Sequence, residues 1–199
     1  MVFASRMACI LLCAGRSSRF AGGSKLEANL GGKPVGDHVS GLLAVMPFAA
    51  RIAVVSQTGF RPHAHDFTIT ENSNPASGLG HSLSLGLRAL GDLDVDAVLI
   101  ALADMPLVSA RHLCRLIAAY DAIGDIVGSS SGTTPMPPAI FPKASFPDLL
   151  NSQGDKGART LLAKAQLVLA SADELLDIDT EDDLARAEDL LRSVTRQSA

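Results

Sequence analysis

Met7–Phe20 reads MACILLCAGRSSRF and is followed five residues later by Lys25. The first half of this stretch is a short, continuous apolar run, which is typical of a strand buried on both faces of a parallel sheet. The run breaks at Gly15, a residue without a side chain that suits a sharp turn and lets a ligand approach the backbone. We therefore expect a strand that ends in a ligand-binding loop.

The composition of this loop favours phosphate binding. Backbone N–H groups around Gly15 and the basic side chains of Arg16, Arg19 and Lys25 offer donors and positive charge to phosphate oxygens. Two common nucleotide-binding signatures do not fit here. A P-loop requires G-x-x-x-x-G-K-[ST], and a dinucleotide fingerprint requires G-x-G-x-x-G after the first strand. The loop is therefore predicted to hold a nucleoside triphosphate in another way.

Bulk properties narrow the class of protein. A length of 199 residues suits one well-buried domain, so we expect residues 1–199 to form a single domain. The net charge of −4 argues against a nucleic-acid partner, and no apolar run reaches the length of a membrane span. Three cysteines, an odd number set in apolar segments, indicate buried thiols and a reducing compartment. The predicted location is the cytoplasm.

Strand and helix patterns alternate along the chain. Apolar strands are predicted at 51–56, 67–70 and 97–103, with amphipathic helices over 79–90 and after Ser109. Such alternation predicts βαβ units, hence an α/β fold of three Rossmann-like layers around a mainly parallel sheet. Ligands of these sheets bind at the carboxyl ends of the strands. The loop after Cys13 and Asp104 both follow strands, so we expect them to share one site.

Two later segments are less regular. Residues 124–142 carry short predicted strands at 125–129 and around 139–141, joined either by a flap that contacts substrate or by a plain surface loop. The last helix is predicted to begin at Thr180, which forms a capping box with Asp183.

Several motifs, in a consistent order, resemble those of the molybdenum-cofactor nucleotidyltransferases and their nucleotidyl-sugar relatives. The loop from Leu12 to Lys25 resembles their glycine, arginine and lysine signature. The other matching segments are Gly31–Val35, Asn72–Leu87, Ala103–Leu107, Gly154–Arg159 and Asp177–Leu184. The GDKGAR sequence of Gly154–Arg159 resembles the cytidylyltransferase-like branch more than the guanylyltransferase branch. Thr134–Pro138 departs from the family's usual Gly-His-Pro segment and leaves the acceptor open.

This resemblance implies a Mg²⁺-dependent nucleotidyltransferase that carries a nucleotidyl group, with CTP favoured, to the phosphate of a molybdopterin-type cofactor and releases pyrophosphate. The attacking phosphate is already ionised near neutral pH, so no strong general base is expected. A molybdoenzyme or its accessory protein is a further candidate partner. Two alternatives remain open: the acceptor is a sugar or alcohol phosphate, or the protein is a non-catalytic cofactor-binding accessory protein.

The resemblance also implies roles for individual residues. Lys25 and Arg19 are predicted to neutralise phosphate charge, and Asp104 to act with them as a catalytic residue. Asp104 and Asp179 are the predicted metal ligands. The predicted nucleotide-binding residues are Leu12, Ala14, Gly15, Arg16, Ser17, Lys25, Asn72, Gly78 and Ser82. The predicted acceptor-binding residues are Asp155, Lys156, Arg159 and Asp177.

Each of these assignments has a purely structural alternative. Asp104 follows a strand and precedes Met-Pro, where an aspartate also serves to cap a turn. Asp177 and Asp179 alternate along a short predicted strand and so share one face, but they equally flank the helix that begins at Thr180. Gly154–Arg159 either meets the acceptor phosphate or starts a helix.

Overall fold

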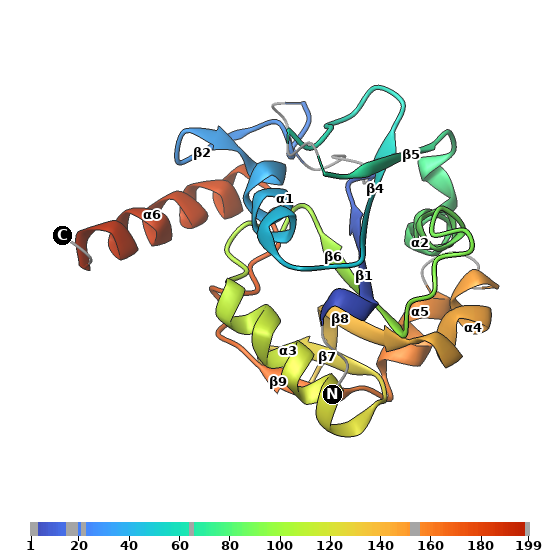
Figure 1. The fold of residues 1–199 in the computed structure, drawn as a ribbon. Helices are drawn as coiled ribbons and strands as arrows, with labels where there is room; N and C mark the ends of the chain where they lie inside the picture. The colour runs from blue at the N-terminus through green and yellow to red at the C-terminus, as the bar shows by residue number, and fades with distance from the viewer. Residues whose placement is uncertain (1–3, 15–19, 21–22, 64–65, 152–155, 198–199) are drawn as a thin grey trace.

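The computed structural model describes residues 4–14, 20, 23–63, 66–151 and 156–197. Strands and helices alternate along much of these residues, as predicted, but β4 is followed directly by β5, β7 by β8 and α4 by α5 (Figure 1). Their bounds are β1 Met7–Leu12, β2 Asn29–Leu30, β3 Lys33–Pro34, α1 Val35–Val45, β4 Ala50–Ser56, β5 Thr68–Asn72, α2 Leu79–Arg88, β6 Ala97–Leu102, α3 Ala110–Ile123, β7 Val127–Ser130, β8 Met136–Pro142, α4 Phe146–Leu150, α5 Lys156–Leu162, β9 Gln166–Leu169 and α6 Glu181–Gln197.

A seven-stranded sheet in the order β5-β4-β1-β6-β8-β7-β9 forms the middle layer. Neighbouring strands of this sheet are parallel, except that β8 is antiparallel to both β6 and β7. The reversed direction of β8 brings its first residue, Met136, to the edge of the sheet where β1 and β6 end. The sheet is therefore mainly parallel, as the sequence predicts, with one strand reversed beside the centre.

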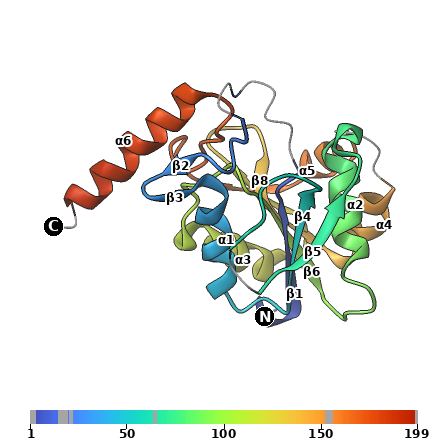
Figure 2. The same cartoon turned by 90° about the horizontal axis from the view of Figure 1, so that it is seen from above.

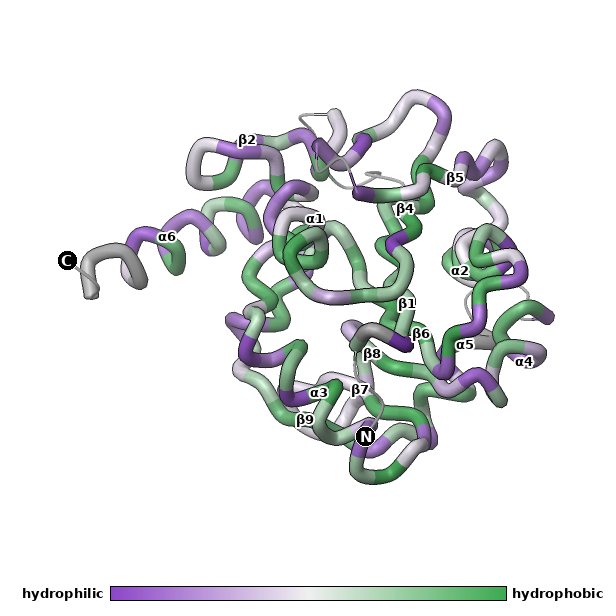
Figure 3. The backbone as a smooth tube through the Cα atoms, in the orientation of Figure 1, coloured by the Kyte–Doolittle hydropathy of each residue, from purple (hydrophilic) through white to green (hydrophobic). Residues whose placement is uncertain are grey.

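Helices cover both faces of the sheet (Figure 2). On β1, Met7, Cys9 and Leu11 face one apolar cluster, which α1 and α3 complete. The residues between them, Ala8, Ile10 and Leu12, face a second cluster that includes side chains of α2, α4 and α5. All six residues of β1 are buried, which explains its continuous apolar sequence. Hydrophobic residues accordingly run along the central strands (Figure 3).

Most predicted elements are confirmed. The strand predicted at 67–70 forms as β5 at Thr68–Asn72, so it begins one residue later and ends two residues later than predicted. The Ser109 side chain accepts a hydrogen bond from the backbone N–H of His112 and caps α3, as predicted. The strands predicted at 125–129 and around 139–141 form as β7 and β8, so the connection between them is residues 131–135. Whether this segment contacts substrate stays a prediction. The strand β9 was not predicted.

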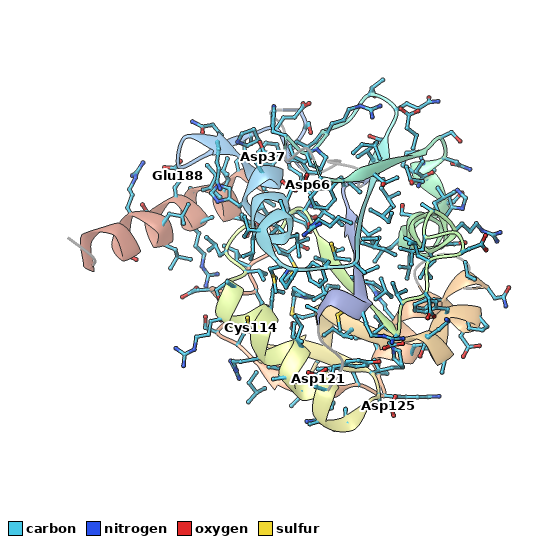
Figure 4. All side chains as sticks on the ribbon, viewed as in Figure 1. Asp37, Asp66, Cys114, Asp121, Asp125 and Glu188 are labelled. Carbon is cyan, nitrogen blue, oxygen red and sulfur yellow. The ribbon has the colours of Figure 1, made fainter. Side chains whose placement is uncertain are left out.

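The cysteine prediction holds for two of the three thiols. Cys9 and Cys13 are buried on β1 and just after it. Cys114 is exposed on α3 (Figure 4), so the prediction of a buried thiol is wrong there. Its position on the outward side of an amphipathic helix explains the difference. Among the described residues, no helix is long and apolar enough to cross a membrane.

The last helix extends away from the three layers (Figure 1). Thr180 and Asp183 form the predicted capping box at its start: Thr180 donates its backbone N–H to Asp183 Oδ2 over 2.9 Å, and Asp183 donates its own to Thr180 Oγ1 over 3.2 Å. Further along, Glu188 (Figure 4) accepts a hydrogen bond from the backbone N–H of Gly31 in the β2–β3 turn. These contacts tie α6 to the rest of the molecule.

The close contact of α2 with the sheet depends on Gly86. A Cβ atom at this position would lie 2.7 Å from Ile10 Cγ2 and 3.0 Å from Val54 Cγ2. We expect Gly86→Ala to lower the free energy of unfolding by about 1–3 kcal/mol, as overpacking does. Gly41→Ala on α1 is the matched control, because no atom lies within 4 Å of its added Cβ. Urea denaturation should show the control equal to or more stable than wild type, whereas equal midpoints for the two variants would contradict the prediction.

Candidate active site

Lys25 is the centre of a cluster of charges drawn from three distant parts of the chain. Its Nζ lies 2.7 Å from Asp104 Oδ2, 2.8 Å from Asp179 Oδ1 and 3.8 Å from Asp177 Oδ1. The lysine is only 6% exposed, whereas the side chains of Asp177 and Asp179 are more than two-fifths exposed. One buried ammonium thus faces the carboxyl groups of one mostly buried aspartate, Asp104, and two partly exposed ones.

Backbone contacts place these carboxylates together. Asp104 follows β6, and Ala103 before it donates its N–H to the Leu12 carbonyl of β1 over 3.1 Å. The N–H of Ile178 donates to the Asp104 carbonyl over 2.9 Å, and Ile178 is fully buried. The aspartates on either side of Ile178 are thereby held beside Asp104. The predicted strand at this position does not form, because the segment bonds to the Asp104 turn and not to the sheet.

The start of α6 contributes to the same arrangement. The backbone N–H of Asp179 donates to Asp183 Oδ2 over 3.2 Å, so the capping box also holds the residue that precedes it. Hydrogen bonds from Thr180 keep the pKa of Asp183 below its ordinary value. This segment therefore both caps the helix and places Asp177 and Asp179 beside Lys25, and their roles toward metal and acceptor stay predictions.

The electrostatics of the cluster follow from burial and from the excess of negative charge. Burial opposes a charge on Lys25, but the carboxylates of Asp104, Asp179 and Asp177 outweigh it, and the pKa of Lys25 is raised. Burial and the neighbouring charge of Asp104 raise the pKa of Asp177 to about 7. The cluster thus holds a protonated lysine and more carboxylate than one lysine neutralises.

The donor set suits a hard divalent cation. Asp104 Oδ1 and Asp177 Oδ1 are buried and meet no N–H or hydroxyl donor among the described residues. A hydrogen bond between the two carboxyl groups also contributes to the raised pKa of Asp177. Buried carboxylate oxygens without such donors are costly unless a ligand occupies them. In the part of the chain that the structure describes, no three acidic, histidine or cysteine side chains form a ready-made metal cage. Mg²⁺ commonly takes one or two carboxylates and completes its shell with water and substrate phosphates.

A cavity of about 630 Å³ adjoins this cluster. It lies where β1 and β6 end, between α2, α5 and the start of β8, and Asp177 forms part of its wall. Of the described residues that line it, only Thr134, Arg159 and Asp177 have polar side chains. The rest of the wall is apolar, with Leu12, Leu83, Met105 and Met136 among its residues. The predicted residues Leu12, Arg159 and Asp177 are thus brought together at one cavity.

The predicted nucleotide-binding residues near α2 are arranged differently. Asn72 is fully buried; its side-chain amide donates to Ser82 Oγ over 2.9 Å, and its Oδ1 accepts from the Asn74 N–H over 2.8 Å. Asn72 and Ser82 therefore join β5 to α2 and are not among the residues that line the cavity. Gly78 precedes α2 with φ 86°, a conformation that favours glycine. Their roles toward a nucleotide stay predictions.

Several predicted residues lie outside the described residues: Gly15, Arg16, Ser17, Arg19 and Asp155. Ala14, at the end of the described strand segment, is half-buried, and Lys156 begins α5. Sequence reasoning missed the apolar walls at Met105 and Met136. A stripe of helical or strand periodicity would not reveal them, because Met105 lies in the turn after β6 and Met136 is the first residue of β8.

Comparison with known proteins gives the class and the family. The sequence model of the MobA-like NTP transferase domain matches residues 9–170. The chain is 32% identical to the purine catabolism protein PucB of Bacillus subtilis (strain 168) over 195 residues, which is 87% of this chain and 92% of PucB. With the site described above, these matches define a nucleotidyltransferase. The chain belongs to the MobA-like NTP transferase family.

Solved structures agree with the fold. Rv0371c from Mycobacterium tuberculosis superposes with a TM-score of 0.76 at 20% identity, over 95% of this chain and 99% of that one. A structure of Rv0371c in complex with manganese superposes with a TM-score of 0.73. Molybdopterin-guanine dinucleotide biosynthesis protein A from Archaeoglobus fulgidus superposes with a TM-score of 0.64 at 19% identity, over 94% of this chain and all of that one. At these identities the likeness is one of fold.

Proposed function

We propose that this nucleotidyltransferase transfers a nucleotidyl group, preferentially from CTP, to the phosphate of a molybdopterin-type acceptor and releases pyrophosphate in a Mg²⁺-dependent reaction. The observation that carries the proposal is the position of Lys25 among Asp104, Asp177 and Asp179, beside a cavity where β1 and β6 end and which Asp177 lines. Residues 1–199 act in it as one nucleotidyltransferase domain.

The reaction needs positioning and charge neutralisation more than proton transfer. An oxygen of the acceptor phosphate attacks the α-phosphorus of the triphosphate, and the bond from that phosphorus to the bridging oxygen of pyrophosphate breaks. The acceptor phosphate is already ionised, so no side chain has to remove a proton from it. Catalysis then rests on holding the groups in line and offsetting negative charge on the α-phosphate and pyrophosphate.

Lys25 suits this role because its ammonium is fixed before substrate arrives. The ion pairs with Asp104 and Asp179 hold Nζ in place, and the raised pKa of Lys25 keeps it protonated. A fixed cation costs little reorganisation when charge develops in the transition state. Arg19 and the backbone near Gly15 act with it in the proposal.

Asp104 and Asp179 are the proposed ligands of Mg²⁺. Their carboxylates are of the hard oxygen type that this ion prefers, and Asp104 Oδ1 is buried and meets no N–H or hydroxyl donor among the described residues. Bound there, Mg²⁺ would offset charge on the triphosphate oxygens. The manganese complex of Rv0371c supports a divalent metal in a protein of the same fold.

The cavity supports an acceptor with apolar faces over a polyhydroxylated one. A sugar buried against its walls would leave hydroxyl groups without hydrogen-bond partners, and each unpaired group costs about 1–3 kcal/mol. A flat heterocycle can place its faces against Leu83 and Met136 and turn its polar edge toward Arg159 or Asp177. This favours the molybdopterin-type acceptor over the sugar phosphates.

The test is pyrophosphate release with Mg²⁺, using CTP, GTP, ATP and UTP in turn, and molybdopterin or a sugar phosphate as acceptor. We expect release with CTP and molybdopterin, and at least tenfold less with each other nucleotide. Release with GTP as the better donor would overturn the preference for CTP, and release with sugar phosphates alone would overturn the acceptor. Tight binding of nucleotide and molybdopterin with no release would favour the accessory protein.

A further inference from the structure

The pairing of β7 with β8 is interrupted beside the cavity. Gly128 pairs with Ala139, but the next residue of β7, Ser129, pairs with Met136, so Pro137 and Pro138 are left between them. Prolines have no N–H to donate, and the ladder offers no partner to the Pro138 carbonyl at this point. The Ser129 hydroxyl fills this gap, since its Oγ donates to the Pro138 carbonyl oxygen over 2.6 Å.

A buried histidine of α3 also contacts the Ser129 hydroxyl. His112 Nε2 of α3 lies 2.7 Å from Ser129 Oγ, and both residues are at most 1% exposed. A serine hydroxyl has one proton, and Ser129 gives it to Pro138, so His112 Nε2 carries the proton of this second bond. His112 Nδ1 is then unprotonated, and it has no partner among the described residues. Burial lowers the pKa of His112, which agrees with a neutral ring.

The start of β8 and the residues just before it also form one wall of the cavity. Thr134, Pro135, Met136 and Pro137 line the cavity opposite α2 and α5. His112 and Ser129 lie behind this wall and do not line the cavity. The backbone N–H of His112 donates to the Ser109 side chain that caps α3, so the start of that helix fixes the histidine.

We propose that His112 and Ser129 are positioning residues which hold the 134–137 wall in the arrangement that binds the acceptor. The inference rests on the proposed function, in which this cavity receives the acceptor. The pair touches no substrate and acts through the Pro138 carbonyl. Without the Ser129 hydroxyl, the wall keeps its backbone pairing to β7 but loses the bond that holds the Pro138 carbonyl. The wall then spends less time in the competent arrangement, and apparent affinity falls in proportion to that fraction.

The first test is the kinetics of Ser129→Ala. We expect the KM for the acceptor to rise about tenfold, which corresponds to about a tenth of the molecules having the competent wall arrangement. The kcat and the KM for the nucleotide should stay within about twofold of wild type. His112→Gln should restore most of the affinity lost in His112→Leu, because its side-chain amide can donate from near the position of Nε2. Ser40→Ala on α1 is the matched control, a buried serine away from the cavity. Equal changes in both KM values and in kcat would overturn the proposal.

A second readout needs no turnover. Hydrogen–deuterium exchange of the Thr133, Thr134 and Met136 amides should be at least fivefold faster in Ser129→Ala than in wild type or Ser40→Ala. If exchange is faster in Ser129→Ala but the wild-type protein releases no pyrophosphate, the positioning role would stand and the proposed reaction would be wrong. Unchanged exchange at these amides would overturn the positioning role, whatever the activity.

Discussion

Lys25→Met is expected to lower kcat about 10³-fold, within the range measured when one fixed group that stabilises developing charge is removed. Methionine keeps much of the length of the side chain and removes only the ammonium that contacts Asp104 and Asp179. The attacking and leaving phosphates then lose a cation that was already in position. The measurement is steady-state pyrophosphate release at saturating nucleotide and acceptor.

The control for this variant is Lys143→Met. Lys143 pairs with Asp94 over 2.9 Å on the exposed surface and should be dispensable. A second measurement distinguishes loss of the lysine from loss of the metal site. Lys25→Met lacks the ammonium but keeps the carboxylates of the cluster, so it should bind Mn²⁺ more tightly than wild type in the absence of nucleotide. Activity of Lys25→Met within about threefold of wild type would refute the catalytic role, since a preorganised charge should contribute far more.

Asp104→Asn is expected to lower kcat/KM about 10³-fold, because a metal ion held at the reacting phosphates supplies several kcal/mol of charge stabilisation. Asparagine has the same shape but lacks the charge that would hold Mg²⁺ and pair with Lys25. Its backbone can still accept from Ile178, so the turn should be preserved. The residual activity should need a much higher concentration of Mg²⁺.

The matched control is Asp94→Asn, an exposed aspartate that pairs with Lys143 and Arg6 far from the cavity. It should keep wild-type activity and wild-type dependence on Mg²⁺. If Asp104→Asn also kept both while losing thermal stability, the residue would be a turn cap and the metal assignment would fail.

The fold was predictable where local pattern and burial agree. All residues of β1 are buried, and a parallel strand in that position reads as a continuous apolar run. The helix α3 has a serine cap and a stripe of buried leucines, both visible in sequence. The strand β9 escaped prediction because Gln166–Leu169 is short and mostly not buried at the edge of the sheet. The direction of β8 depends on long-range pairing, which a local pattern does not encode.

The candidate site was predictable as a set of residues but not as an arrangement. Asp104, Asp177 and Asp179 were identified from motifs, and the structure brings them to one lysine. What draws them together is the bond from Ile178 to Asp104, a backbone contact with no signature in sequence. The contact of His112 with Ser129 is similar, since it joins a helix to a strand across a gap that only the β7–β8 register creates.

The reversed strand β8 has a consequence for how such a protein can change over evolution. The part of the site proposed to bind the nucleotide is made by crossovers, whose helices are packed into the core, so insertions there would disturb both layers. The opposite wall is the end of a hairpin between two antiparallel strands. Hairpin connections accept new lengths and side chains with little effect on the strands that carry them. If the proposed reaction holds, one scaffold can therefore keep its donor chemistry while its choice of acceptor diverges.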